Sequence, residues 1–227
     1  MKLWPCAVSK YKSGCLMKTS EIEAIFKIWQ KTNPNPKTEL NYSNPYELLV
    51  AVVLSAQATD KRVNIVTEDL FALANSPRQM IQLGEKKLIQ CIQSIGLFRS
   101  KAANIIKLSH LLIEHHQERI PDNLDELVAL PGVGVKTANV VLNELYDLPT
   151  IAVDTHIFRV SNRLGFAKAK TVEQVEKQLI QVVPDVYKKH AHHWMILHGR
   201  YICQARKPLC ENCDIRQYCH WRKANEQ

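Results

Sequence analysis

Residues 130–138 read Leu130-Pro131-Gly132-Val133-Gly134-Val135-Lys136-Thr137-Ala138, a glycine turn that opens into a helical pattern. Gly132 and Gly134 tolerate positive φ and carry no Cβ, so backbone N–H groups of the turn can approach an anion closely. Apolar residues then recur at helical spacing, namely Ala138, Val141, Leu142 and Leu145. The unpaired N–H groups of that helix N-terminus would face the same anion. The stretch therefore predicts a helical hairpin that binds a phosphate, with DNA as the natural partner.

Lys136 stands in the first turn of the predicted helix. The positive end of the helix macrodipole disfavours a cation there by ~0.3–1 kcal/mol, so burial or other cations would have to supply further activation. Lys136 is a candidate amine nucleophile on this reasoning. An ordinary tight turn with a solvated lysine explains the same residues equally well.

Asp154 is a second candidate, because it ends the apolar run 151–153 and precedes another helical pattern. Ile157, Val160 and Leu164 lie on one face of that pattern. The simplest role for Asp154 is a helix N-cap, which needs no chemistry. A capping carboxylate stays ionised and rigidly held, so the same residue can also take part in a reaction.

Cysteines near the C-terminus have the spacing C-x6-C-x2-C-x5-C, at Cys203, Cys210, Cys213 and Cys219. Four thiols within one short segment strongly indicate a metal site, and disulfides are disfavoured in a chain without a secretion signal. Structural zinc favours two separated cysteine knuckles, whereas this spacing forms one compact centre and slightly favours iron–sulfur. Zinc stays open as an alternative, with His198 and His220 as rival ligands.

The chain of 227 residues has a formal net charge of +8 and a pI near 9.1. This balance favours a polyanionic partner, although an acidic protein or a membrane surface would also suit it. A run of ~20 apolar residues is absent from the sequence, so we expect no membrane span and a cytoplasmic location. Residues 1–16 lack the apolar segment of a secretory signal and are expected to be a disordered extension, in which Cys6 and Cys15 are incidental.

Helical periodicity extends over nearly the whole chain, without strand alternation, and predicts an all-α fold. Ser20 and Glu23 have the spacing of a capping box. Helix starts are expected at Ser20, Asn44-Pro45, Ser76-Pro77, Ser100 and Thr171, and stops at Gly84 and Gly96. The expected core includes Ile22, Ile25, Phe26, Trp29, Leu48, Leu49, Val52, Val53, Leu88, Ile89, Ile92, Ile105, Ile106, Leu112, Val175, Leu179 and Val182.

Together, the hairpin, Asp154 and the cysteines resemble the endonuclease III family of helix-hairpin-helix base-excision DNA glycosylases. The match runs from about Asn33 to the end, through residues 39–42, 54–60, 95–97, 153–156 and 192–194. The resemblance implies a bifunctional enzyme that excises oxidised pyrimidines and then nicks the abasic strand. Its implied partner is double-stranded DNA with oxidised pyrimidines or abasic sites, bound by a monomer.

The resemblance also implies an architecture of two helical lobes. A six-helix barrel would span residues 38–148, with the helix-hairpin-helix at about 124–146. Residues 17–37 and 149–227 would form a lobe closed by one [4Fe–4S] cluster on the four cysteines. The active cleft would lie between the lobes, with Lys136 from one side and Asp154 from the other.

Further site residues carry over from the family. Gln57 matches the residue that fills the vacated hole in the duplex, and an exposed helix-terminal glutamine is the alternative. Leu97 matches a wedge that props the opposite strand, against the alternative of a buried loop leucine. Arg206 and Lys207, between the first two cluster cysteines, suit phosphate binding. Val135 departs from the family, which commonly has a basic residue there.

Other functions remain possible at this level. A related adenine glycosylase lacks the nucleophilic lysine and typically carries an extra C-terminal domain, so Lys136 and the short C-terminus argue against it. A catalytically silent module that binds DNA structure through the hairpin, and a zinc-binding regulator, are the alternatives outside catalysis.

Overall fold

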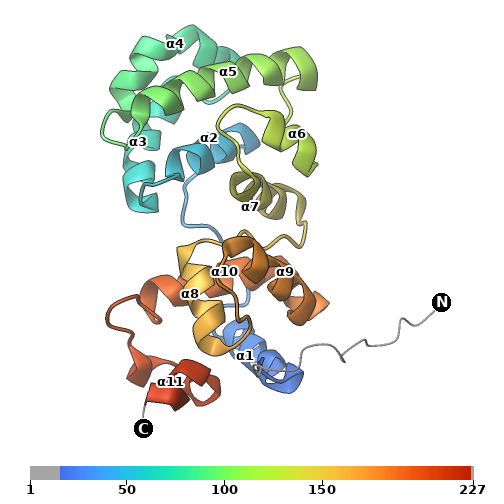
Figure 1. Ribbon diagram of the computed structural model, residues 1–227. Helices are drawn as coiled ribbons and strands as arrows, with labels where there is room; N and C mark the ends of the chain where they lie inside the picture. The colour runs from blue at the N-terminus through green and yellow to red at the C-terminus, as the bar shows by residue number, and fades with distance from the viewer. Residues whose placement is uncertain (1–15, 226–227) are drawn as a thin grey trace, which may run out of the picture. The chain divides into compact units, whose positions relative to one another are not determined.

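The computed structural model describes residues 16–225, and all regular structure within them is helical (Figure 1). This confirms the all-α prediction. The α-helices are α1 (Thr19–Thr32), α2 (Pro45–Ser55), α3 (Asp60–Leu73), α4 (Pro77–Ile92), α5 (Phe98–His116), α6 (Leu124–Ala129), α7 (Val135–Tyr146), α8 (Thr155–Leu164), α9 (Val172–Val182), α10 (Asp185–Tyr201) and α11 (His220–Asn225). Two 3-10 turns, η1 (Cys210–Asn212) and η2 (Arg216–Tyr218), precede α11.

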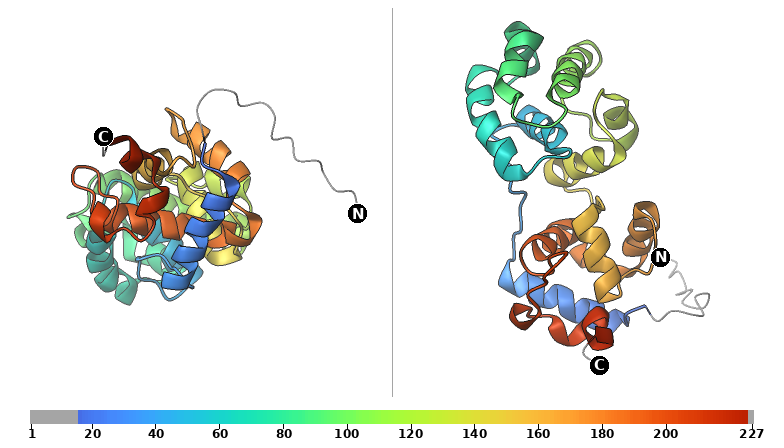
Figure 2. Two further views of the ribbon diagram at one scale, coloured as in Figure 1. Left: turned by 90° about the horizontal axis from the view of Figure 1, so that it is seen from below. Right: turned by 60° about the vertical axis from the view of Figure 1, so that its left-hand side comes forward.

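The chain divides into two compact units (Figure 2). Unit 1 comprises Met1–Asn35 and Val153–Gln227, and unit 2 comprises Pro36–Ala152. Unit 2 is described throughout and contains α2 to α7, whereas the described part of unit 1 contains α1 and α8 to α11. The chain thus leaves unit 1 after α1 and returns to it at α8.

Helix α2 is the centre of unit 2. Every residue from Tyr46 to Leu54 is buried, so the helix is enclosed on all sides rather than amphipathic. It packs against α3, α5 and α7. The predicted stripe of Leu48, Leu49, Val52 and Val53 is therefore only part of a fully buried helix.

An aromatic cluster forms the core of unit 1. The ring of Phe26 in α1 stacks on Phe166 and Tyr187, with centroids 5.7 and 5.3 Å away. The indole Nε1 of Trp194 in α10 donates a hydrogen bond to the carbonyl of Asn33, 2.8 Å away. These contacts attach the N-terminal helix to the part of the chain that follows unit 2.

Most of the predicted core residues are buried. Ile89, Ile106 and Val182 are the exceptions and are only half-buried. The helix starts at Asn44, Ser76 and Thr171 are also confirmed, since each side chain accepts a hydrogen bond from a first-turn N–H. Gly84 interrupts α4 with a φ of +76°, and Gly96 lies in the turn between α4 and α5.

Two predicted helix starts are wrong. Helix α1 begins at Thr19, before the expected Ser20, because the carboxylate of Glu21 accepts a hydrogen bond from the Lys18 N–H at 3.3 Å. Glu23 is therefore not the partner of a capping box. Helix α5 begins at Phe98, directly after a left-handed residue, so Ser100 lies inside the helix.

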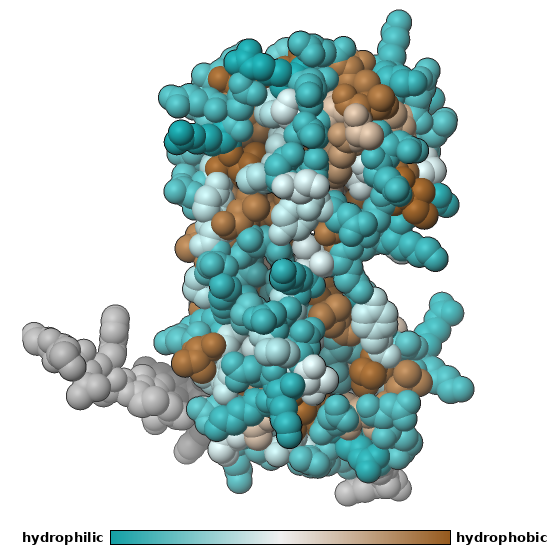
Figure 3. All heavy atoms as spheres, turned by 180° about the vertical axis from the view of Figure 1, so that it is seen from behind, coloured by the Kyte–Doolittle hydropathy of each residue, from teal (hydrophilic) through white to brown (hydrophobic). Residues whose placement is uncertain are grey.

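None of the described helices is long and apolar enough to cross a membrane. On the face drawn in Figure 3, hydrophobic side chains form separate groups among hydrophilic ones. The predicted N-terminal extension, with Cys6 and Cys15, lies outside the described residues except for Leu16. The next residue, Met17, is buried, and its N–H donates to the carbonyl of Gly165 at 2.9 Å.

Candidate functional site

The glycine hairpin joins α6 to α7, as predicted, but its two glycines have different roles. Gly132 has a φ of +82°, and a Cβ there would lie 3.0 Å from side-chain atoms of Asn104. Gly134 has a φ of −91°, so it does not use the positive φ that a glycine tolerates. A Cβ on Gly134 would meet no atom within 4 Å. Gly132 thus permits the turn and its packing, whereas Gly134 leaves open space at the start of α7.

The N-terminus of α7 lies at this open space. Its N-cap residue, Gly134, has no side chain to cap the helix, and the first turn contains no acidic residue. Buried Leu130 and Val133 anchor the turn below it, and the Val133 N–H donates to the Leu130 carbonyl at 3.1 Å. Lys136 is exposed in the first turn, where the sequence predicted it. A helix end of this kind suits an anion such as a phosphate.

Asp154 is the N-cap of α8. Its Oδ1 accepts hydrogen bonds from the backbone N–H groups of His156 and Ile157, both at 2.8 Å. The buried segment 151–153 precedes it, and Ile157 faces the core of unit 1. The capping role is thus real, and it holds a half-buried carboxylate in one fixed orientation.

Gln57 and Leu97 lie in two turns of unit 2 that contact each other. Both have a φ of +58°, a left-handed conformation that is unusual for residues with a side chain. A Cβ on Gly96 would lie 3.9 Å from the carbonyl oxygen of Gln57. Leu97 is 61% exposed, so the alternative of a buried loop leucine is wrong. Gln57 is exposed as well.

All four C-terminal cysteines line one pocket of unit 1, together with apolar residues that include Leu164, Ile202 and Leu209. Burial is the main reason that the pKa of Cys213 is raised to about 11, and burial also raises the pKa of Cys219. Within residues 16–225, no group of three His, Cys, Asp or Glu side chains is arranged to hold a metal ion.

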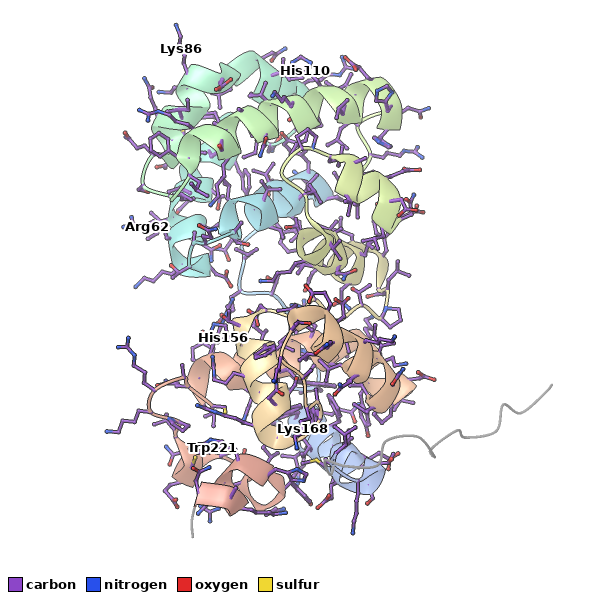
Figure 4. The ribbon with its side chains drawn as sticks, viewed as in Figure 1. Arg62, Lys86, His110, His156, Lys168 and Trp221 are labelled. Carbon is purple, nitrogen blue, oxygen red and sulfur yellow. The ribbon has the colours of Figure 1, made fainter. Side chains whose placement is uncertain are left out.

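Two arginines of α8 hold the backbone that begins the cysteine loop. Arg159 donates to the carbonyl of Cys203 at 2.9 Å, and Arg163 donates to those of Gln204 and Ala205 at 2.8 and 2.9 Å. The Arg163 guanidinium also lies over the ring of Trp221, which Figure 4 labels. These contacts connect the helix capped by Asp154 to the cysteine loop.

Arg206 and Lys207 follow directly in that loop, and both are exposed. The loop closes where the Leu209 N–H donates to the Ile202 carbonyl at 2.9 Å. The two cations are therefore presented on a segment whose start and end are fixed by hydrogen bonds.

The sequence reasoning missed Arg159, Arg163 and Lys101. Lys101 is 5% exposed, and its Nζ donates to the carbonyls of Leu54 and Ala56 at 2.9 and 2.6 Å. A signal for Lys101 was present, because it lies at helical spacing with the core residues Ile105, Leu108 and Leu112. No comparable pattern marks the two arginines, whose partners are backbone carbonyls far away in the sequence.

Comparison with known proteins gives consistent results. The family model of the HhH-GPD superfamily base excision DNA repair protein matches residues 50–185. Endonuclease III of Rickettsia conorii is 55% identical over 205 residues, which cover 90% of this chain and 98% of the relative. Endonuclease III of Escherichia coli K12 is 52% identical over 206 residues, covering 91% and 97% of the two chains.

Solved structures agree with these relatives. The structure of a trapped endonuclease III–DNA covalent intermediate has a TM-score of 0.86 at 43% identity, covering 93% of this chain and 100% of that chain. A non-covalent endonuclease III–DNA complex gives the same TM-score and identity. A thermostable thymine-DNA glycosylase has a TM-score of 0.79 at 19% identity, which shows a shared fold.

Proposed function

The chain belongs to the endonuclease III family of the HhH-GPD superfamily, and we propose that it excises oxidised pyrimidines from duplex DNA with Lys136 as its nucleophile. The protein is a bifunctional DNA glycosylase and abasic-site lyase of base excision repair. The observation that carries the proposal is the exposed Lys136 in the first turn of a helix whose N-cap is a glycine, in a family with a trapped DNA intermediate.

The reaction begins with extrusion of the target nucleotide, because C1′ of a stacked deoxyribose is shielded. Flipping costs a few kcal/mol and costs least for a damaged, poorly stacked base, which contributes to selectivity. Phosphates beside the lesion would bind at the hairpin, where Gly134 leaves room at the N-terminus of α7. Gln57 and Leu97 would occupy the space that the nucleotide vacates.

The neutral amine of Lys136 then attacks C1′, and the C1′–N bond to the base breaks. The base leaves with the bonding electron pair and takes up a proton. The C1′–O4′ bond of the resulting aminal then breaks, O4′ takes up a proton, and C1′ is left in a Schiff base with Lys136. The Schiff base makes the 2′ proton acidic, so its removal expels the 3′ phosphate and breaks the strand. Water finally releases the sugar from Lys136.

Asp154 is proposed to assist the first step. Its fixed carboxylate would stabilise positive charge that develops on the sugar, or help to deprotonate the attacking amine. The two backbone N–H groups that donate to Oδ1 keep this carboxylate oriented.

We propose one [4Fe–4S] cluster on Cys203, Cys210, Cys213 and Cys219. The four thiols line a common apolar pocket. Four cysteine thiolates are the usual ligand set of such a cluster, and their compact spacing favours it over the two separated knuckles of structural zinc. When bound, the cluster would fix the loop that carries Arg206 and Lys207, and these two cations would bind DNA phosphates.

The architecture proposed for this activity assigns a barrel to unit 2 and the cluster lobe to unit 1. The protein would act as a monomer on cytoplasmic DNA that contains oxidised pyrimidines or abasic sites. A catalytically silent DNA-binding module would not need an amine at position 136, and a zinc regulator would not need the hairpin.

The direct test uses a duplex with one thymine glycol. The wild-type protein should release the damaged base and cut the strand 3′ to the site. Lys136→Gln should form neither product while it retains DNA binding. The control is Lys107→Gln, which changes another exposed lysine of unit 2 and should behave as wild type. Base release at the wild-type rate by Lys136→Gln would refute the role of Lys136.

A further inference from the structure

The Gln57 turn (residues 56–59) and the Leu97 turn (residues 93–97) present two left-handed residues on one side of unit 2. Figure 1 shows that α2 ends and α5 begins on the same side of this unit. The turns lie close together, since a Cβ added to Gly96 would lie 3.9 Å from the Gln57 carbonyl oxygen. A left-handed conformation is unfavourable for side chains with a Cβ, so surrounding contacts must hold both turns in place.

Lys101 supplies contacts to both turns. Its ammonium donates to the carbonyls of Leu54 and Ala56, at 2.9 and 2.6 Å, which lie at the C-terminal end of α2. Such carbonyls lack partners within their own helix, and a cation there also complements the helix macrodipole. The backbone N–H of Lys101 donates to the carbonyl of Leu97 at 3.0 Å. The side chain of Lys101 therefore holds the segment before Gln57, while its backbone belongs to the helical turn that begins at Leu97.

The surroundings of Lys101 explain why this link is rigid. Its stem lies on the core face of α5 with Ile105, Leu108 and Leu112, all fully buried. Burial also lowers the pKa of Lys101 from its ordinary value. A buried polar group keeps its hydrogen bonds because breaking them would leave it without water.

Exposed cations flank the paired turns. Lys61 and Arg62 lie in the first turn of α3, and Arg99 lies in the first turn of α5. Figure 4 labels Arg62 beside the end of α2. A projecting leucine and glutamine beside positive charge suit a polyanion whose bases are opened.

We propose that Lys101 is a positioning residue of the DNA interface, which locks the Gln57 and Leu97 turns into one rigid projection that enters the duplex at the lesion. The inference rests on the proposed function of Gln57 and Leu97. A preformed projection avoids the cost of ordering two side chains when DNA binds. This benefit arises when DNA contains an abasic site or an extruded nucleotide, and it does not arise with an intact duplex.

The test compares two duplexes of the same sequence at one salt concentration, an undamaged duplex and one with a tetrahydrofuran abasic analogue. Lys101→Met keeps the apolar stem and removes the donors. We expect the affinity for the abasic duplex to fall about tenfold, and the affinity for undamaged DNA to change less than about twofold. Lys101→Arg should restore much of the loss, because it retains the charge and the donors.

Lys107→Met is the matched control, since it removes an exposed lysine from the same helix. It should not change the ratio of the two affinities. If circular dichroism shows that Lys101→Met is unfolded, the same measurements are made on Lys101→Gln. Its amide group can still donate to the Leu54 or Ala56 carbonyl, so part of the interaction is retained. Equal losses on both duplexes, or no loss on the abasic duplex, would overturn the role of Lys101.

Gln57→Ala and Leu97→Ala separate this inference from the function on which it rests. If neither change weakens abasic-duplex binding, the proposed insertion of these side chains is wrong, and the role of Lys101 fails with it. If both weaken binding and Lys101→Met does not, the inference about Lys101 alone is wrong.

Discussion

Asp154 combines a structural and a chemical role in one side chain, and the two can be separated by experiment. Asparagine is also a good N-cap, so Asp154→Asn should retain the fold of α8 while it removes the charge. We expect the single-turnover rate of base excision to fall about 10²–10⁴-fold, the usual range for a positioned acid–base group. Rapid-quench assays on a thymine glycol duplex measure this rate.

Thr171→Ala is the control for the capping role, because Thr171 caps α9 in the same unit. It should lower stability by about 0.5–2 kcal/mol without slowing excision. An Asp154→Asn protein with an unchanged excision rate would reduce Asp154 to a helix cap.

Residue roles were predictable where the local sequence determines them. The position of Lys136 in the first turn of α7 follows from the preceding glycines, and the capping role of Asp154 follows from the apolar run before it. The exposure of Leu97 was not predictable, because its left-handed turn lies beside the turn of Gln57, which is distant in the sequence. Distant partners of this kind leave no trace in the local pattern.

At the scale of an element, the two glycines of the hairpin are expected to differ in their effect on stability. Gly132→Ala should destabilise unit 2 by about 1–2 kcal/mol, because alanine is strained at positive φ. The close contact with Asn104 adds to that cost. Gly134→Ala should cost less than about 1 kcal/mol, since its conformation is ordinary. Thermal unfolding of both variants measures these differences.

DNA affinity gives the second half of this test. Gly134→Ala should weaken binding to duplex DNA, because the new methyl group occupies the space in front of α7. Wild-type affinity in this variant would mean that no phosphate binds there.

The contact of α2 with α5 includes a buried hydrogen bond whose effect depends on pH. The hydroxyls of Tyr46 and Ser109 lie 2.6 Å apart, and Ser109 also donates to the Ile105 carbonyl. Burial raises the pKa of Tyr46 above its ordinary value of 10.0. The unfolded chain therefore ionises Tyr46 first, and the wild-type protein loses stability as the pH rises above 10.

Tyr46→Phe should cost about 0.5–1.5 kcal/mol of unfolding free energy at pH 7, the net worth of one buried hydrogen bond. The deficit should shrink above pH 10 by up to about 1.4 kcal/mol per pH unit, because phenylalanine has no proton to lose. Urea unfolding of the wild-type and Tyr46→Phe proteins at several pH values measures this difference in unfolding free energy. A deficit that stays constant from about pH 8 to 11 would contradict this account.

Elements were predicted best where a side chain caps the helix. Asn44, Ser76 and Thr171 each mark a start correctly, because the capping hydrogen bond is local. Ser20 and Ser100 did not mark starts, since Glu21 and the left-handed Leu97 fix those helix ends instead.

At the scale of the whole molecule, metal loss should affect the two units differently. Cys213→Ala should remove most of the bound iron and visible absorption, and it should lower the unfolding temperature of unit 1, because ligand binding and folding are coupled there. Unit 2 has its own core and should unfold as before. Iron analysis and calorimetry measure the two effects.

Cys91→Ala is the matched control, because Cys91 is a half-buried cysteine of α4 outside the cysteine loop. It should leave the iron content unchanged. Full iron content in Cys213→Ala would remove this cysteine from the proposed cluster.

The division of the chain was less accessible from the sequence than its helices. The hydrogen bond from Trp194 to the Asn33 carbonyl joins segments 161 residues apart, and no local sequence pattern predicts it. The four cysteines, in contrast, were recognisable as one site because their spacing is short. Sequence spacing thus predicts sites within a segment better than the association of distant segments.

The central claim, that Lys136 is the nucleophile, is tested most directly by chemical trapping. Sodium borohydride reduces a Schiff base to a stable amine, so the protein can be joined to an abasic-site duplex, digested and mapped by mass spectrometry. The account predicts a sugar adduct on the peptide that contains Lys136. An adduct on another lysine or on the N-terminal amine, with Lys136 unmodified, would contradict it.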